Sequence, residues 1–304
     1  MAATATAPTA QTTQITRTPR GRIGRVVRAL GAYPMLTVGL SLILAIVLMS
    51  LIGPHFVEKD RVNVGYALPD QRPSREYLLG TDTVGRQMLA IVIYGTPMTL
   101  KVGLIAGAIG LVVGTLFGLI SGYYGGISDS VLRGAADAFL TVPGLLVLVV
   151  IATTFQGGIS VSTQALVVSA LAWMYPTRTI RSQVLSIRER SYVQLARFSG
   201  MNGLEIITKE IVPNLLPYLA ASFVGAVSAA ILASIGLEAL GLGPQNEPTL
   251  GMTIYWSMYY TSILRNLWWW FAPPIIIIVM IFMGLFMISA GLDQIANPRL
   301  RSRT

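Results

Sequence analysis

The sequence of 304 residues contains no cysteine and a single histidine, His55. The lack of cysteine excludes a disulfide framework and a thiolate metal site, and one histidine cannot form a histidine cluster. Charged residues make up only 12% of the chain, whereas a globular domain usually has about 25%. The phosphate-binding pattern G-x-x-x-x-G-K-[ST] is also absent. We therefore expect a chain that hydrolyses no nucleotide and is not an enzyme.

Apolar residues dominate the composition instead. Hydrophobic types make up 53% of the chain, and the mean hydropathy is +0.65. A soluble core cannot bury so much apolar surface with so few charges, so the composition places the chain in a lipid bilayer. The formal net charge of +9 is typical of a membrane protein with basic loops on the cytoplasmic side. We expect a lipid partner and no nucleic-acid partner.

Six apolar runs are long enough to cross the hydrocarbon layer, which is about 30 Å thick and needs about 20 helical residues. Inside lipid the backbone must satisfy its own hydrogen bonds, so these patterns allow only helices. The sequence therefore predicts an all-α, polytopic membrane protein with six transmembrane helices, at residues 35–53, 98–121, 135–155, 162–180, 215–240 and 270–291. The second helix should pack closely in the interior, because glycines recur along it every three or four residues: Gly103, Gly107, Gly110, Gly114 and Gly118.

The spans divide the chain into regions of different character. Residues 1–33 are typical of a disordered, basic tail. We expect this tail to be retained, because the apolar run after it exceeds the about 7–15 residues of a signal peptide and no A-x-A site follows. The remaining regions are a first transmembrane helix at 34–53, an extracytoplasmic loop at 54–97, a core of five transmembrane helices at 98–292 with a charged loop at 181–214, and a C-terminal tail at 293–304.

Basic residues predict which side of the membrane the termini face. Six spans put both termini on one side. Placing them in the cytoplasm assigns fifteen lysines and arginines to the inner segments and six to the outer loops. Positive charge is generally enriched on the cytoplasmic side. We expect both termini and the charged loop 181–214 to lie in the cytoplasm.

The loop 181–214 is amphipathic, although the spans beside it are almost wholly apolar. Four residues recur at helical spacing and predict a short helix with a small-residue face: Tyr192, Leu195, Ala196 and Ser199. Gly200 would end this helix. A helix of this kind could insert its small face into a groove on another protein. A solvated connecting loop is the alternative, and periodicity alone leaves both interpretations open.

The same loop resembles the EAA loop of binding-protein-dependent ABC importer permeases. The resemblance rests on Gln194-Leu195-Ala196, then Gly200, then Ile211-Val212-Pro213. It implies a coupling helix that docks in a cleft of an ATPase subunit. The implied coupling residues are Tyr192, Gln194, Leu195, Ala196, Ser199, Gly200, Ile211 and Pro213. Gln194 replaces the usual acid of the motif, and Leu195 replaces its first alanine.

Other blocks of sequence are similar to the dipeptide/oligopeptide branch of these permeases. They are "LGTDTVGRQMLAIVIYGTPMTLKVG" at 79–103, "DSVLRGAADAFLTVP" at 129–143, "LEALGLGPQ" at 237–245 and "GLDQIANPRLR" at 291–301. Each block alone is weak, but four in the same order are specific. The resemblance implies the type I ABC importer permease fold in a prokaryotic cytoplasmic membrane.

The resemblance also implies a set of partners. These are a homologous second permease subunit, two ATPase subunits or a fused pair that bind ATP and Mg²⁺, and an extracytoplasmic solute-binding protein that docks on the outer loops. The chain itself would hold no cofactor. The implied solutes are di- or oligopeptides. Oligosaccharides are the alternative, and a secondary transporter is a more distant one, since no second copy of the first three spans is evident.

Three charged residues are candidates for a gate or a solute pathway. Asp137 follows Arg133 by one helical turn, which predicts either a solvated ion pair at the cytoplasmic end of the third span or a gate. Glu238 lies near the outer end of the fifth span, where it could line a pathway or lie at the membrane interface. We interpret Trp268, Trp269 and Trp270 as part of an aromatic belt.

The loop at 54–97 is expected to be folded rather than open. It balances five basic and five acidic residues and contains Gly80-Thr81-Asp82, a turn sequence. We expect Arg86 to open the next helix. The loop should pack on the outer face of the membrane domain.

Overall fold

The computed structural model describes residues 33–155 and 158–296. Most of the expected tails at 1–33 and 293–304 lies outside these residues. The described part is helical apart from loops and one isolated antiparallel bridge between Thr81 and Gln87. The expectation of an all-α protein is confirmed.

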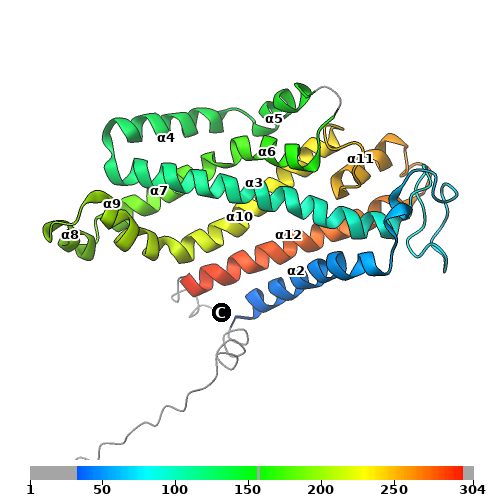
Figure 1. Cartoon of the computed structure of the whole chain (residues 1–304), viewed down its shortest axis with the longest axis horizontal. Coiled ribbons are helices and arrows are strands. Elements are labelled where there is room, and N and C mark those ends of the chain that lie inside the picture. The colour runs from blue at the N-terminus through cyan, green and yellow to red at the C-terminus, as the bar shows by residue number, and fades with distance from the viewer. Residues whose placement is uncertain (1–32, 156–157, 297–304) are drawn as a thin grey trace, which may run out of the picture.

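Long helices run side by side through the molecule (Figure 1). The helices and helical turns are α2 (Pro34–Ile52), η1 (Gly53–His55), η2 (Lys59–Val62), α3 (Met88–Tyr124), α4 (Gly126–Thr141), α5 (Gly144–Thr153), α6 (Val161–Ala172), α7 (Met174–Arg188), α8 (Ser191–Phe198), α9 (Gly203–Ile206), the π-helical turn η3 (Ile207–Ile211), α10 (Val212–Ala239), α11 (Leu250–Tyr259) and α12 (Trp268–Ala296). We call residues 53–87 the cap. The two ends of the bundle are then the cap end and the α8 end.

Four helical segments of the described chain are long and apolar enough to cross a membrane: Pro34–His55, Met88–Tyr124, Gly203–Ala239 and Trp268–Ile295. A fifth is added if α4 and α5 are counted as one bent span. Length and composition therefore support four or five spans, and the expected number of six stays a prediction.

The third expected span, 135–155, is not one straight helix. It belongs to α4 and α5, whose axes differ by 86° across a short break. The break falls at Val142, which has extended backbone angles, and at Pro143. Proline lacks an amide donor and disfavours helical angles at the residue before it, so Pro143 explains why the helix stops here. The prediction of a continuous span was wrong at this point.

The fourth expected span, 162–180, corresponds to α6 and most of α7. Trp173 between them keeps helical backbone angles, with φ −80° and ψ −22°. Only α6 is strongly apolar, because α7 carries Arg178, Arg181 and Arg188. The two helices follow one another along α3 (Figure 1).

Helix α3 forms the centre of the bundle and contacts α10 on one side and α6 and α7 on another. With 37 residues at about 1.5 Å each, it is about 55 Å long. It begins at Met88, ten residues before the expected start at 98. The expected boundary was wrong because Pro97 lies inside the helix. Tertiary packing of Met88 and Ile91, which are fully buried, stabilises the turns before this proline.

The glycines of α3 allow these close contacts. A Cβ atom added to any of the five expected interface glycines would lie 2.3–2.9 Å from atoms of a neighbouring helix. The nearest residues, in order from Gly103 to Gly118, are Ile231, Val227, Ala172, Pro176 and Ile180. The prediction of an interior, closely packed helix is confirmed. The row of contacts also passes from α6 into α7 without interruption.

Helices α2 and α12 form a second close pair along one side of the bundle (Figure 1). Gly39 of α2 lies against the backbone of Gly284, where an added Cβ would come within 2.7 Å of a carbonyl oxygen. At the α8 end, Gly291 lies against Leu36. Small residues therefore set the spacing of this pair too, as in many membrane helix contacts.

The cap is folded and packed on the bundle, as expected. The fully buried Asp82 accepts hydrogen bonds from the amides of Val84 and Arg86, at 3.0 and 2.8 Å, and from Arg86 Nε at 2.6 Å. Burial raises the pKa of the Asp82 carboxyl, and the Arg86 guanidinium opposes that rise. Thr81 Oγ1 donates to the Leu68 carbonyl at 2.7 Å. A tight polar turn thus stabilises the cap beside the apolar contacts of Val57, Val62 and Leu79.

Two of the three tryptophans attach the cap to α12. Trp269 Nε1 donates to the Thr81 carbonyl at 3.1 Å, and Trp270 is fully buried beside Met88 and Ile91. Trp268 alone is exposed, at 54%. The interpretation of all three as an aromatic belt was therefore wrong for Trp269 and Trp270. Their burial depends on the cap folding back over α12, which no local pattern reveals.

Candidate functional site

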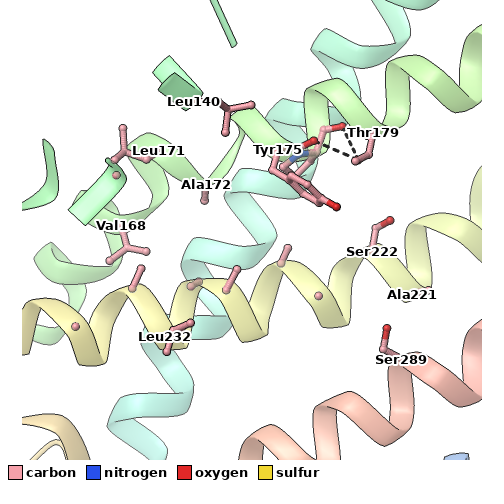
Figure 2. A pocket seen from close by; sticks show the side chains of 18 of the residues that line it. Leu140, Val168, Leu171, Ala172, Tyr175, Thr179, Ala221, Ser222, Leu232 and Ser289 are labelled. Atoms are coloured by element: carbon pink, nitrogen blue, oxygen red, sulfur yellow. Dashed lines mark hydrogen bonds between the residues drawn. The ribbon is translucent and has the colours of Figure 1, made fainter. Parts of the chain in front are cut away.

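A groove of about 770 Å³ opens beside α10. Helices α4, α5, α6, α7, α10 and α12 contribute its walls (Figure 2). Helix α10 presents mainly small residues to it: Ala221, Ser222, Gly225, Ala226, Ala229, Ala230, Ala233 and Gly236. Small side chains leave the space open without a change in the helix backbone.

Polar groups are few in the groove and are mostly hydroxyls. Figure 2 shows Tyr175 and Thr179 on one wall, Ser222 of α10 on another and Ser289 of α12 on a third. Asp293 and Tyr218 complete the polar lining. Within the described residues, no group of three or more His, Asp or Glu side chains is placed to hold a metal ion. The arrangement can offer hydrogen bonds to a polar solute.

The candidate residues Arg133 and Asp137 form an ion pair on α4. Arg133 Nε lies 3.8 Å from Asp137 Oδ2, and Arg178 Nη1 of α7 lies 3.8 Å from Asp137 Oδ1. All three side chains are about half exposed or more. The expectation of a solvated ion pair is confirmed. Neither Arg133 nor Asp137 is among the residues that line the groove, and a gating role stays a prediction.

Glu238 lies elsewhere than expected. Its side chain is fully buried rather than facing a pathway or a membrane interface. It accepts hydrogen bonds from Gln164 Nε2 of α6 at 2.9 Å and from the Met252 amide of α11 at 3.0 Å. Both expected positions were wrong, because α11 and the chain before it fold back against α10 and cover this residue.

A second polar contact, partly buried and at the α8 end, was not identified from the sequence. Arg181 of α7 binds Asp129 of α4, with Nη2 donating to Oδ2 at 2.7 Å, and Ser121 of α3 also donates to Asp129. Asp129 belongs to a sequence block singled out above. Its partner lies 52 residues away, so spacing gave no indication of the pair.

The loop 181–214 contains the expected short helix, α8. The helix ends at Phe198, and Gly200 follows with φ +84°. The amide of Met201 donates to the Ala196 carbonyl at 3.2 Å, and the amide of Gly200 donates to the Arg197 carbonyl at 3.1 Å. This pair of bonds is the Schellman motif, which needs a left-handed residue where Gly200 stands. The expectation that Gly200 ends the helix is confirmed.

The orientation of α8 differs from the expected one. Ala196 and Val193 are buried in the chain's own apolar cluster, together with Ile180, Ile206 and Ile211. Of the expected small residues, Ala196 is buried inside the molecule, whereas Ser199 and Gly200 are exposed. Ala196 is thus covered by the chain itself, and the docking of α8 on a partner stays a prediction. Helical periodicity identifies the two faces but not which of them the chain itself covers.

Large apolar residues form the free face of α8. Phe198 is 87% exposed, Leu195 67% and Tyr192 38%. Gln194 and Ser199 are exposed as well. Ser199 Oγ donates to the Leu195 carbonyl at 2.9 Å, and Gln194 Nε2 donates to the Glu189 carbonyl at 3.3 Å. We call Tyr192, Leu195 and Phe198 the α8 face. An exposed apolar set of this kind at a charged end of the bundle is typical of a protein contact.

The end of the loop fixes α8 to the bundle. Asn202 and Glu205 form a capping box that starts α9. Ile211 is fully buried in the same cluster as Ala196, and Pro213 lies in the first turn of α10. Proline fits there because first-turn amides have no helical partner. The α8 face is thus held on a packed support rather than on a free loop.

Comparison with known proteins places these features in a family. Residues 114–302, more than half of the chain, match the model of the binding-protein-dependent transport system inner membrane component. The chain is 28% identical over 263 residues to the dipeptide transport system permease protein DppC of Bacillus subtilis, covering 86% of this chain and 81% of that protein. It is 31% identical over 221 residues to DppC of Haemophilus influenzae, covering 70% and 74%.

Two further comparisons concern a shorter sequence match and a solved structure. The oligopeptide transport system permease protein OppC of Mycobacterium tuberculosis is 31% identical over 175 residues, so this chain spans 60% of the length of that relative. An inward facing structure of the MetNI methionine ABC transporter shares the fold, with a TM-score of 0.50 and 19% identity, over 67% of this chain and 94% of that one. The expected permease fold is confirmed. The chain belongs to the family of inner membrane components of binding-protein-dependent transport systems.

Proposed function

We propose that the chain is one permease subunit of an ATP-driven importer and forms half of the pathway for di- or oligopeptides. The groove beside α10 carries this proposal, because it combines open space, small side chains and a few hydroxyls. Hydroxyls can exchange hydrogen bonds with the peptide groups of many solutes without selecting one side chain. The names of the DppC and OppC relatives support peptides as the solute class.

Oligosaccharides receive less support as the solute. The aromatic residues between 255 and 270 could stack on sugar rings, but none of them lines the groove. Trp269 and Trp270 are buried beneath the cap, and neither lines the groove. Only Tyr175 and Tyr218 bring aromatic rings to it.

A second, homologous permease subunit would complete the pathway. The groove is bounded by helices of this chain on its sides, while Leu232 in its lining is 62% exposed. Exposed apolar side chains at the edge of the groove need either lipid or protein against them. A paired subunit would cover them and close the pathway to lipid.

The energy would come from partner ATPase subunits, either two separate chains or a fused pair, which would bind ATP and Mg²⁺. This chain would hold no cofactor. The α8 face would dock in an ATPase cleft, because its exposed apolar side chains stand on a rigid support. Closure of the ATPases on nucleotide could then move α7 and α10 through the apolar cluster that holds Val193 and Ala196.

The predicted orientation agrees with this division of roles. Both termini and α8 would face the cytoplasm of a prokaryotic cell, and the cap would face outward. A solute-binding protein would dock at the cap, where Phe56, Val64 and Leu68 are at least 70% exposed. Apolar side chains outside the bilayer on a folded support are typical of a protein contact.

Reconstitution tests the function directly. The chain, purified from its native membrane with the subunits that remain bound, is placed in proteoliposomes with ATP on the ATPase side. Labelled tripeptide and pentapeptide are offered with the cognate binding protein, and maltotriose serves as the competing solute class. We expect ATP-dependent peptide uptake. ATP-dependent uptake of the sugar alone would overturn the solute class, and uptake by the chain without ATPases would overturn the importer mechanism.

A further inference from the structure

The carboxylate of Glu238 lies at the meeting point of three helices. Oε1 accepts from Gln164 Nε2 of α6 at 2.9 Å and from Ser234 Oγ of α10 at 3.1 Å. Oε2 accepts from Thr249 Oγ1 at 2.7 Å and from the Met252 amide at 3.0 Å, both at the start of α11. We call these five residues the Glu238 cluster.

The Glu238 cluster is buried, so its polar groups need hydrogen-bond partners within the protein. Glu238, Gln164, Ser234 and Thr249 have no exposed surface. A buried carboxylate is tolerated only where donors surround it. Here the amide of Gln164 turns its Nε2 toward Glu238 and leaves its own Oε1 without a hydrogen-bond partner in the described chain. The same Nε2 also donates to Ser234 Oγ at 3.0 Å and to the Ser234 carbonyl at 3.3 Å. Since an unpaired buried acceptor is unfavourable, the contacts with Glu238 and Ser234 together hold this side chain in its orientation.

The surrounding backbone is shaped to admit the carboxylate. A Cβ atom added to Gly251 would lie 2.2 Å from Glu238 Oε2, and one added to Gly243 would lie 2.6 Å from Glu238 Cγ. Nearby, the Leu250 amide donates to Thr99 Oγ1 of α3 at 3.1 Å. The chain between α10 and α11 is thus seated deep in the bundle by polar contacts rather than by apolar packing alone.

The cluster stands directly behind one end of the groove. Gly236 and Ala233 of α10 line the groove within five residues of Glu238, and Val168 of α6 lines it one turn after Gln164. Helix α5 lines the opposite wall, through Leu145 and Leu148. This helix contributes no residue to the cluster, buries only Leu148 and Ala152, and follows the 86° break after α4.

We propose that Glu238 is a positioning residue that joins α6, α10 and α11 into one rigid wall of the groove. The role of this wall in transport rests on the proposed function, whereas the contacts that form the wall do not. With this wall moving as one body, changes in the width of the groove come from its other walls, α5 among them. The acid in the sequence "LEALGLG" therefore acts on the solute pathway without touching the solute.

Spin-label distances test the proposal, because a chain without cysteine allows pairs of labels to be placed freely. Exposed positions are available on all four helices: Leu146 on α5, Leu166 on α6, Leu232 on α10 and Tyr259 on α11. The pairs 166/259 and 232/259 report on the wall, and the pair 146/259 reports on the groove. The measurements use the full chain in lipid nanodiscs, alone and assembled with its ATPases.

Variants that remove one donor each should loosen one helix each. Gln164→Leu should broaden the 166/259 distribution and leave 232/259 narrow. Thr249→Val should broaden all three pairs, because each of them ends on α11. Glu238→Gln replaces one carboxylate oxygen with an NH₂ group, which would face hydrogen-bond donors. This variant should broaden the distance distributions most. Ser228→Ala is the matched control, since Ser228 Oγ bonds only to the Val224 carbonyl of its own helix at 3.0 Å.

The proposal fails if Gln164→Leu and Thr249→Val leave both wall distances as in the unmodified chain, or if Gln164→Leu broadens all three pairs equally. In the assembled transporter, trapping with ATP and vanadate should shift 146/259 and leave 166/259 in place. Equal shifts of both would also overturn the proposal. A wild-type assembly with no ATP-dependent uptake would refute the transport function instead. The selective broadening is measured without nucleotide, so its result does not depend on transport.

Discussion

Arg181 of α7 binds Asp129 of α4 through two hydrogen bonds, with Nη2 donating to Oδ2 at 2.7 Å and Nε donating to Oδ1. Two parallel bonds from one guanidinium fix orientation as well as distance. Both side chains are about 20% exposed. Helix α4 buries only Ala136. The ion pair is therefore a main attachment of α4 to the bundle.

Removing one charge of this pair should weaken that attachment. Exposed ion pairs contribute about 0.2–1 kcal/mol and breaking a buried one costs about 3–5 kcal/mol, so a pair of intermediate burial suggests about 2 kcal/mol. We expect Asp129→Asn to lower the free energy of unfolding by this amount in thermal unfolding of the purified chain. The control is Arg133→Gln, whose half-exposed pair with Asp137 at 3.8 Å should contribute little. Equal effects of the two variants would contradict the attachment.

The glycine contacts of α3 give a second prediction. A Cβ added to Gly114 would lie 2.6 Å from Pro176 Cβ and 2.7 Å from the Trp173 carbonyl oxygen. Since neither the proline ring nor the backbone can move aside, Gly114→Val should separate α3 from α7 and destabilise the chain by about 1–3 kcal/mol. Gly134→Ala on α4 is the matched control, because nothing lies within 4 Å of its added Cβ.

The Gly134→Ala variant should keep or raise stability, because alanine favours a helix over glycine by about 1 kcal/mol. Thermal unfolding of both variants in one detergent provides the comparison. A Gly114→Val chain as stable as the Gly134→Ala chain would show that α3 and α7 can move apart freely.

The close packing of these glycines could be predicted from the sequence, whereas the buried environment of Glu238 could not. Small residues repeated along one helix face are a local pattern, and such a helix packs closely whichever partner it meets. The environment of Glu238 depends on α11, which begins at Leu250 and returns to cover it. Local patterns carry no information on that return. An acid near a helix end therefore has the same sequence signature in water as in a buried cluster.

The same distinction explains the outcome at α8. Its existence and its end at Gly200 follow from local signals, namely helical spacing and a residue that tolerates positive φ. Its orientation depends on the cluster around Ile180 and Ile211, which come from other helices. The break at Val142 was accessible in principle, because Pro143 was visible in the sequence. Continuous hydrophobicity on both sides of it outweighed this signal.

The cap provides a third prediction, since Asp82 serves as its internal template. Asp82→Ala would remove three hydrogen bonds and leave Arg86, which is 12% exposed, without its carboxylate. We expect a loss of about 3 kcal/mol within the cap, on the scale for breaking a buried pair. Hydrogen exchange followed by mass spectrometry should then show faster exchange of the amides of Val84 and Arg86.

The control for the cap is Asp60→Asn. Asp60 is exposed, and its carboxylate accepts only a 3.4 Å bond from Asn63 Nδ2. This variant should leave exchange in the cap unchanged. Unchanged exchange in Asp82→Ala as well would mean that the packing of cap residues such as Leu79 against Trp269 suffices to hold the cap.

The last prediction concerns the α8 face, for which docking on an ATPase is proposed. Leu195→Asp and Phe198→Asp place charges on side chains that are 67% and 87% exposed. Surface substitutions usually change stability by no more than about 0.5 kcal/mol, so the isolated chain should unfold as before. If the face fills a cleft, each substitution should cost about 2 kcal/mol of binding energy, which is a loss of more than tenfold in affinity. Ile127→Asp, at 84% exposure on α4, controls for a charge on another exposed apolar residue.

Val193→Asp separates docking from folding. Val193 is fully buried on the opposite side of α8, so a carboxylate there would be unpaired in an apolar cluster and should unfold the loop. Affinity for the purified ATPase subunits, measured by titration in nanodiscs, should therefore fall in Leu195→Asp and Phe198→Asp at unchanged thermal stability. In Val193→Asp affinity and stability should fall together. Full affinity in both surface variants would exclude the α8 face as the coupling contact and return the small residues Ser199 and Gly200 to consideration.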